Sequence, residues 1–265
     1  MKKLYAILLA FGLLAPVTLL ADGTATVNLR PSHIDITAAT SQSAVLVTLS
    51  GYSTDDVKYR LYNGSNQYNC WDIVSGTYIS STAYANGPSA PGSPSTGTTF
   101  WIPFERGSNA TTSASYRDRL GPAYSSNNNT FVLPSATEIT TSFSLTGALL
   151  GNSELPLTDK YVILGFNGAT LVSAVSSDIA TGAFTLLCPE GISLDKVEVR
   201  TLTNAIVASI TGSYTASANL GNISLETAAD INAPVFTTGF PRASNINTTQ
   251  ADLEVSMDEA GTAYY

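Results

Sequence analysis

Short runs in which apolar or β-branched residues alternate with polar ones recur along the chain. The clearest covers 57–62 and reads VKYRLY, so that every second side chain would face the same side of a strand. Comparable runs cover 25–29, 44–49, 99–104, 161–166, 184–187 and 196–200. No stripe with helical spacing follows the first 21 residues. The pattern predicts an all-β fold, built as an antiparallel β-sandwich.

Turn-forming residues separate these runs. Asn63-Gly64-Ser65-Asn66 directly follows a predicted strand and indicates a tight turn. The stretch 86–98, NGPSAPGSPSTGT, is rich in Pro, Gly and Ser. Because strand-like aromatic segments lie on both sides of it, we expect a long surface loop within one domain rather than a linker between two.

The first 21 residues have the layout of an export signal. Lys2 and Lys3 precede an apolar run that ends at Leu20, and the small residue Ala21 follows. This order is typical of a cleaved secretory signal peptide. We therefore predict a signal peptide over 1–21, cleavage before Asp22, no membrane span after its removal, and a secreted or cell-surface location.

Composition narrows the class of protein. Charged residues make up only 12% of the 265 residues, hydrophobic residues 44%, and the net charge is -8. Disordered chains combine high charge with few aromatic residues, which is not the case here. Nucleic-acid binding requires clustered Lys and Arg, so we expect no nucleic-acid partner.

The two cysteines, Cys70 and Cys188, are an even number in a chain predicted to reach an oxidising compartment. Two alternatives remain open, one disulfide between them or two buried free thiols. Neither cysteine belongs to a C-x-x-C pair, so metal and redox motifs of that kind are excluded.

A domain boundary is predicted near residue 230, where Pro234 imposes an extended backbone on the residue before it. The following sequence is APVFTTGFPRASNINTTQADLEVSMDEAGTAYY. It resembles the start of an immunoglobulin-like or fibronectin type III-like repeat of bacterial surface proteins. The resemblance implies an incomplete immunoglobulin-like β-sandwich over 230–265, truncated in mid-strand, after a β-sandwich domain over 22–229.

The larger region resembles N-terminal modules of large multidomain exported proteins of Gram-negative bacteria. The segments that carry the likeness are FWIPFERGSNATTSASYRDRLGP and KYVILGFNGATLVSAVSSD. The resemblance implies an extracellular, modular setting and no chemistry. We expect a noncatalytic exported structural or adhesive cell-surface protein. The alternative is an accessory region of a secreted hydrolase whose catalytic domain lies beyond residue 265.

The segment 230–236, DINAPVF, is similar to the linker between cadherin repeats, which binds calcium. Only Asp230 and Asn232 match its ligands, whereas calcium usually takes about 6–8 oxygens. We therefore expect a generic linker and no cofactor, with calcium at 230–232 as the lesser alternative.

Catalytic motifs are absent from the sequence. The single histidine, His33, follows Ser32 and lies near Asp35, but no G-x-S-x-G turn is present to display a nucleophile. One histidine also cannot make a multi-histidine zinc site. Adjacent acids such as Asp55 and Asp56 would point to opposite faces of a strand. We expect no enzymatic activity and no metal site.

Half of the aromatic side chains fall between residues 52 and 124, interleaved with Arg, Asn and Ser. Rings beside hydrogen-bonding groups can bind sugars, although most rings in a β-sandwich fill its core. We expect Trp101 to be in the core. If a surface for an extracellular glycan or surface polymer exists, the candidates are Tyr68, Trp71, Tyr84 and Tyr116.

Overall fold

The computed structural model contains two compact units, Met1–Leu225 and Glu226–Tyr265. It describes residues 23–35, 38, 40–52, 57–63, 66–79, 87–106, 118–122, 131–132, 135–151, 157, 159–225, 237–239, 241–250 and 252–256. Over these residues the chain forms strands, turns and loops with no helix, which confirms the all-β fold class. The predicted signal peptide lies outside the described residues. No helix in the described part is long and apolar enough to cross a membrane.

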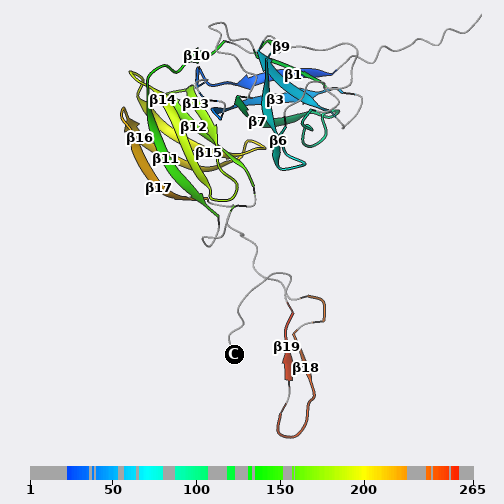
Figure 1. Ribbon diagram of the computed structural model, residues 1–265. Helices are drawn as coiled ribbons and strands as arrows, with labels where there is room; N and C mark the ends of the chain where they lie inside the picture. The colour runs from blue at the N-terminus through cyan, green and yellow to red at the C-terminus, as the bar shows by residue number, and fades with distance from the viewer. Residues whose placement is uncertain are drawn as a thin grey trace, which may run out of the picture. The chain divides into compact units, whose positions relative to one another are not determined.

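The first part of unit 1 is a sheet of eight described strands (Figure 1). Its strands follow the order β1-β3-β7-β5-β4-β8-β9, and β6 pairs with β5. Their bounds are Thr24–Leu29 (β1), Gln42–Ser50 (β3), Tyr59–Asn63 (β4), Asn66–Asp72 (β5), Thr77–Ile79 (β6), Thr98–Arg106 (β7), Asp118–Pro122 (β8) and Phe131–Val132 (β9).

The second part of unit 1 is a β-sandwich. One layer has the order β14-β11-β17 and the other β13-β12-β15-β16. The strands are Ser142–Leu150 (β11), Tyr161–Asn167 (β12), Thr170–Ser176 (β13), Ala183–Pro189 (β14), Leu194–Thr201 (β15), Ile206–Tyr214 (β16) and Ala218–Ser224 (β17). Most neighbours are antiparallel, and β11 and β17 are parallel. A short parallel pair, His33–Ile34 (β2) with Thr137–Glu138 (β10), lies outside both layers.

The pairing of β4 with β5 agrees with the predicted turn, and the predicted loop lies within unit 1 as expected. The loop is not wholly at the surface, because Gly87, Pro88, Ala90 and Pro94 are buried. β4 and β5 pair antiparallel, with Asn63 opposite Asn66, and Gly64 and Ser65 between them lie outside the described residues. The described residues between β6 and β7 form bends and turns within unit 1. Gly97 has φ 102°, a backbone conformation that favours glycine.

Three apolar clusters stabilise unit 1. The N-terminal cluster lies within the first sheet and includes Val47, Leu61, Phe100 and Ile102. The C-terminal cluster lies inside the β-sandwich and includes Leu145, Ile163, Leu186 and Val197. The interlayer cluster joins the two parts and contains Ala44, Leu46, Trp71, Trp101, Val162, Leu164, Phe166, Leu171, Ala174 and Leu202.

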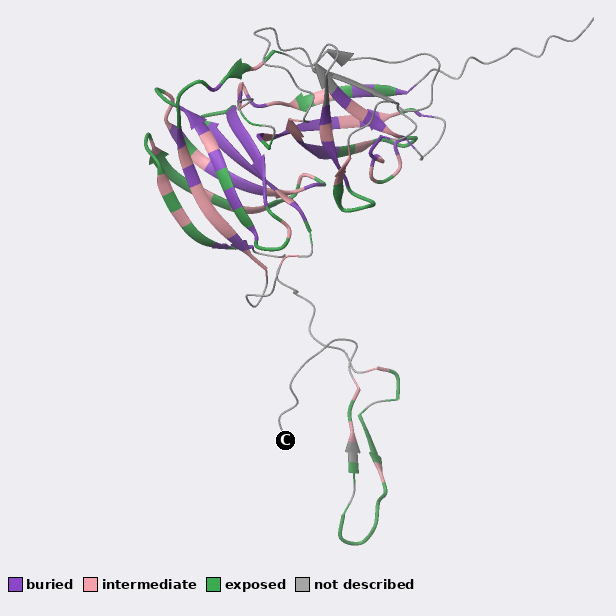
Figure 2. Cartoon of the chain, viewed as in Figure 1, coloured by how far each residue is buried: buried purple, intermediate pink, exposed green. Residues whose placement is uncertain are grey.

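The interlayer cluster explains why several strands are apolar on both faces. In β3, Val45 and Val47 face the N-terminal cluster, whereas Leu46 faces the interlayer cluster. In β12, Ile163 faces inside the sandwich and Leu164 faces the interlayer cluster. Strands that are buried on both faces are continuously apolar. The purple strands of Figure 2 therefore lie in the middle of unit 1.

Unit 2 contains one described hairpin, Arg242–Ser244 (β18) with Asp252–Glu254 (β19). The side chains of Arg242 and Glu254 form an ion pair of 2.6 Å across it. Residues 230–236 and 257–265 of the expected immunoglobulin-like segment lie outside the described residues. The structure places the boundary between units after Leu225, whereas we expected it after residue 229.

Candidate functional site

A cleft of about 660 Å³ opens where the two parts of unit 1 meet. We call it the interlayer cleft. The β5–β6 hairpin and the segment 34–42 contribute one wall, and β13, β14 and the turn after β13 contribute the other. The side chains on which its chemistry depends are Asp35, Gln42, Trp71, Tyr78, Lys160 and Ser176.

Lys160 is the cation of the interlayer cleft, and its ammonium group is almost fully enclosed. It is 6% exposed, and its Nζ donates a hydrogen bond of 2.8 Å to the carbonyl oxygen of Ser177. The same Nζ lies 4.2 Å from the ring centroid of Trp71 and 5.0 Å from that of Tyr78. Aromatic faces attract cations, so the two rings replace part of the lost hydration.

Burial lowers the pKa of Lys160 to about 8, because removal from water disfavours the charged form. The charges of Asp178 and Glu105 act in the opposite direction and offset part of the shift. Lys160 forms no ion pair with any described residue. Its ammonium is therefore held by one carbonyl and two rings rather than by a carboxylate.

A chain of hydrogen bonds crosses the interlayer cleft. The hydroxyl of Ser176 on β13 donates to Oε1 of Gln42 on β3 at 2.9 Å. Ser176 therefore accepts from the hydroxyl of Tyr78 on β6, at 2.8 Å. Burial is the main reason that the pKa of Tyr78 is raised, so this tyrosine remains a neutral donor. The chain connects the sandwich with two strands of the first sheet.

The carboxylates beside the interlayer cleft are engaged in local structure. Oδ1 of Asp178 accepts from the hydroxyl and the backbone N–H of Thr181, both at 2.8 Å, and from the N–H of Ala180 at 3.0 Å. The bonds from Thr181 are the main cause of its lowered pKa. Asp35 accepts a hydrogen bond of 2.7 Å from the hydroxyl of Ser41. Asp178 is thus an ionised turn-capping group.

A second, smaller cleft of about 320 Å³ lies against the same aromatic group. Trp71, Gly76, Lys160 and Ile179 line both clefts, so they form a wall shared by the two. The ring of Tyr78 meets that of Trp71 edge-on, with centroids 5.2 Å apart. Since Lys160 and Tyr78 both cover Trp71, little of its face is open for stacking on a ligand.

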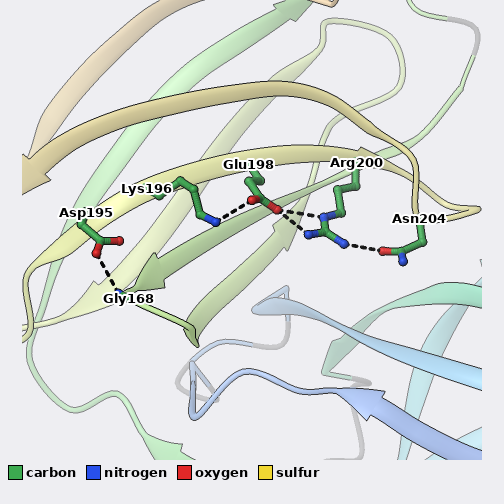
Figure 3. Close-up of polar contacts among 6 residues, drawn as sticks. All are labelled: Gly168, Asp195, Lys196, Glu198, Arg200 and Asn204. Atoms are coloured by element: carbon green, nitrogen blue, oxygen red, sulfur yellow. Dashed lines mark hydrogen bonds and ion pairs between the residues drawn. The ribbon is translucent and has the colours of Figure 1, made fainter.

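A row of polar side chains follows β15 from Lys196 to Arg200 and continues to Asn204 (Figure 3). Glu198 is 5% exposed and pairs with Lys196 at 2.7 Å and with Arg200 at 2.6 Å. Burial alone would raise the pKa of Glu198, but the bonds from Lys196 and Arg200 lower it. Arg200 and the indole of Trp101 both donate to Oδ1 of Asn204, at 2.8 and 2.9 Å. This row is a tie between the two parts of unit 1.

No catalytic triad forms around His33. Its Nδ1 lies 2.9 Å from the hydroxyl of Ser32, and burial lowers the pKa of the imidazole. Asp35 instead bonds to Ser41. In the described residues no carboxylate orients the His33 ring, and no group of His, Cys, Asp and Glu could hold a metal ion.

The structure places two of the four proposed ligand-binding aromatics in the interior. Tyr68 is 3% exposed in the N-terminal cluster, with its ring centroid 5.2 Å from that of Phe104. Trp71 is 7% exposed, although it borders both clefts. Tyr84 and Tyr116 lie outside the described residues. The prediction that Trp101 is in the core is confirmed, because it is 1% exposed.

Both cysteines are buried free thiols. Cys70 belongs to the N-terminal cluster and Cys188 to the C-terminal cluster, so they lie in different cores and form no disulfide. Burial raises the pKa of Cys188 to about 12, which keeps it protonated. Of the two alternatives left open by the sequence, the structure therefore has two buried free thiols rather than a disulfide. The calcium alternative at Asp230 and Asn232 falls outside the described residues.

Sequence reasoning missed Tyr78, Lys160 and Ser176, which the fold brings together. Tyr78 had the aromatic signal of its neighbours, and Lys160 directly precedes the apolar run of β12. A charge at the edge of a buried run is a signal that could have identified Lys160. Ser176 is one of many serines, so nothing in the sequence distinguished it.

Comparisons with known proteins give no family. No protein-family model and no curated protein matches the chain. Among solved structures, the chain is similar to BcpA, the major pilin subunit of Bacillus cereus, at 8% identity and a TM-score of 0.21, covering 77% of this chain and 69% of that one. It is also similar to the Bacillus anthracis TIE protein, at 13% identity and a TM-score of 0.22, covering 77% of this chain and 41% of that one.

Proposed function

We propose that this chain is a noncatalytic exported protein with a structural or adhesive role at the cell surface. The observation that carries the proposal is the state of the polar groups in the interlayer cleft. Lys160 is bonded to a carbonyl and covered by rings, Asp178 caps a turn, and Tyr78, Ser176 and Gln42 form one hydrogen-bonded chain. These groups hold the fold, and none is arranged as a nucleophile with an activating base.

The construction of unit 1 supports a mechanical role. The interlayer cluster joins the two parts by apolar contact, and the hydrogen bond from Trp101 to Asn204 joins them at a second place. Tyr78 and Ser176 join them at a third. Several separate ties resist relative rotation of the two parts, which suits a module that transmits force or presents a surface.

The interlayer cleft supports an adhesive role for the same module. Its volume of about 660 Å³ lies within the range of small-ligand sites, roughly 300–1,000 Å³. Hydroxyl and amide groups lie beside apolar walls, which is the mixture that a sugar unit needs. Because Trp71 is already covered, contact with an extracellular glycan or surface polymer would run through exposed residues at the cleft, such as Thr77 and Thr185.

The test uses a substitution that fills the cleft without disturbing the core. Thr77→Arg places a long side chain in the interlayer cleft from an exposed position, and Ser75→Arg places the same side chain on the same hairpin outside it. Each protein is applied to a glycan array and to insoluble polysaccharides, and the ligands are analysed afterwards for cleavage.

We expect the natural chain and Ser75→Arg to bind the same polymer, Thr77→Arg to bind at least tenfold more weakly, and no cleavage product to form. Equal binding by both variants would remove the cleft from the adhesive role. A released product that accumulates with time would contradict a noncatalytic function.

A further inference from the structure

In the β-sandwich of unit 1, a side-chain hydrogen bond joins β13 to β14 on one side, whereas β16 and β17 form a more open side. β13 is buried along nearly its whole length, and the hydroxyl of Ser173 on it donates to the carbonyl of Leu187 on β14. On the opposite side, β16 pairs only with β15, and β17 only with β11, within the described residues. Both are mostly exposed or half-buried, as the green and pink strands of Figure 2 show.

The two open edges differ in regularity. β17 contains Gly221 with φ 70°, and its pairing with β11 shifts register between Thr146 and Ala148. A bulge of this kind interrupts an edge and blocks the addition of another strand. β16 is longer, and its register shifts lie toward its two ends, leaving a regularly paired centre from Ala208 to Thr211.

β16 also lacks the charges that normally protect an edge. The sequence from Thr201 to Leu225 contains no Asp, Glu, Lys, Arg or Pro. Natural sheets use charged residues and proline to prevent pairing between exposed edges. The hairpin of unit 2, in contrast, carries Arg242 and Glu254 on its strands. The regularly paired centre of β16, Ala208 to Thr211, has no such charge or proline and is suited to accept a strand.

Apolar side chains along β16 remain incompletely covered. Ile206 is 55% exposed. Val207, Ala208, Ile210 and Tyr214 are only partly buried, although they pack against the C-terminal cluster. Along the central pairing, Ala208 and Ile210 lie opposite the fully buried Val199 and Val197. A further strand beside β16 would cover them and extend the layer β13-β12-β15-β16.

We propose that β16 is an assembly edge and that its occupant is β16 of a second copy of this chain, added antiparallel around a twofold axis. Two identical strands related by a twofold axis perpendicular to the sheet run antiparallel and keep their inner faces on the same side. With the axis at Ile210, Ser209 of one copy lies opposite Thr211 of the other, and the two four-stranded layers become one continuous sheet.

Charge selects the second copy over a charged partner. The chain carries a net charge of -8, so two copies repel each other, and the repulsion at a contact is smallest where neutral surfaces meet. The strand 206–214 is neutral along its length and therefore meets itself without an unpaired charge. The inference goes beyond the proposed function, because it depends on sheet geometry and not on the interlayer cleft.

The first experiment measures the mass of the purified full chain by sedimentation velocity over a range of concentrations. Ser209→Lys combined with Thr211→Lys places like charges opposite each other across the proposed contact, at positions exposed in the single chain. Thr24→Lys combined with Thr26→Lys is the matched control, because it charges two exposed positions on β1, the uncharged edge of the first sheet.

We expect a dimer for the natural chain and for the β1 control, and an association at least a hundredfold weaker for the β16 variant. A natural chain that is still monomeric at about 100 µM would overturn the proposal. Its Kd would then exceed that concentration, which corresponds to a free energy of dimerisation weaker than about -5.5 kcal/mol. A dimer that survives the β16 lysines but not the β1 lysines would overturn it equally.

A second experiment decides the matter if the lysine variant does not fold. Ser209→Cys combined with Thr211→Cys places cysteines opposite each other between copies, at a separation that a disulfide can span. Ser209→Cys alone is the control, because position 209 of the second copy lies diagonally across the contact, too far away for a disulfide between the two copies. Rapid oxidation of the double variant to a covalent dimer supports the arrangement, and equal oxidation of both variants contradicts it.

Discussion

Replacement of Trp101 by alanine is the most informative perturbation of unit 1. The Trp101 side chain is 1% exposed and belongs to the interlayer cluster, its indole N–H donates to Asn204, and its backbone N–H donates to the carbonyl of Leu202 at 2.7 Å. A single side chain from β7 therefore contributes both apolar and polar contact with the sandwich.

The expected magnitude follows from these contacts. A buried tryptophan removes about 150–250 Å² from water, which at about 25 cal/mol per Å² corresponds to about 4–6 kcal/mol. Alanine retains its own small share of that area, and cavity-forming substitutions of this size cost about 3–5 kcal/mol. We expect Trp101→Ala to lower the free energy of unfolding of unit 1 by about 3–5 kcal/mol.

The assay is urea denaturation followed by far-ultraviolet circular dichroism. Trp101→Phe and Asn204→Gly form a double-mutant cycle that isolates the indole hydrogen bond, since glycine tolerates the φ of 73° at position 204. We expect a coupling free energy of about 1 kcal/mol. A loss below about 1 kcal/mol for Trp101→Ala would show that the interlayer cluster does not join the two parts.

Four further outcomes follow from the same structure. The pKa of Lys160 is lowered to about 8 in the folded chain, against an ordinary value of 10.5. Between these values the unfolded chain binds more protons, so the free energy of unfolding rises with pH. Lys160→Met should remove that rise in denaturation curves recorded between pH 7.5 and 9.5. Cys70 and Cys188 should resist iodoacetamide in the native chain and both react in denaturant, whereas an intact mass lower by two hydrogen atoms would reveal a disulfide. Tyr78→Phe removes the donor to Ser176 and should cost about 1 kcal/mol by thermal or urea unfolding, with no loss contradicting the hydrogen-bonded chain. N-terminal sequencing of the exported protein should begin at Asp22 or within a few residues, and an intact Met1 on membrane-bound protein would contradict a cleaved signal.

The sequence was informative about strands whose side chains are strongly apolar. The runs at 44–49 and 161–166 are found within β3 and β12, because their β-branched and aromatic residues fit a buried pleated sheet. It did not reveal β16 or β17. These strands are rich in Ser, Thr, Asn and Gly and lie at exposed edges, so no alternation of buried and exposed positions marked them.

The arrangement of unit 1 as two joined parts also could not be predicted. Leu46 and Leu164 belong to the same cluster, although more than a hundred residues separate them. A run buried on both faces shows only that something covers each face and does not identify the covering strand. The candidate site failed to emerge for the same reason, since Tyr78 and Ser176 meet only through this long-range packing.

The location of the protein tests the proposed function most directly. An antibody raised against the purified chain should label intact, unpermeabilised cells of the organism that encodes it, because a structural or adhesive surface protein must be accessible from outside. The account predicts equal labelling before and after permeabilisation. Labelling that appears only after permeabilisation would contradict it.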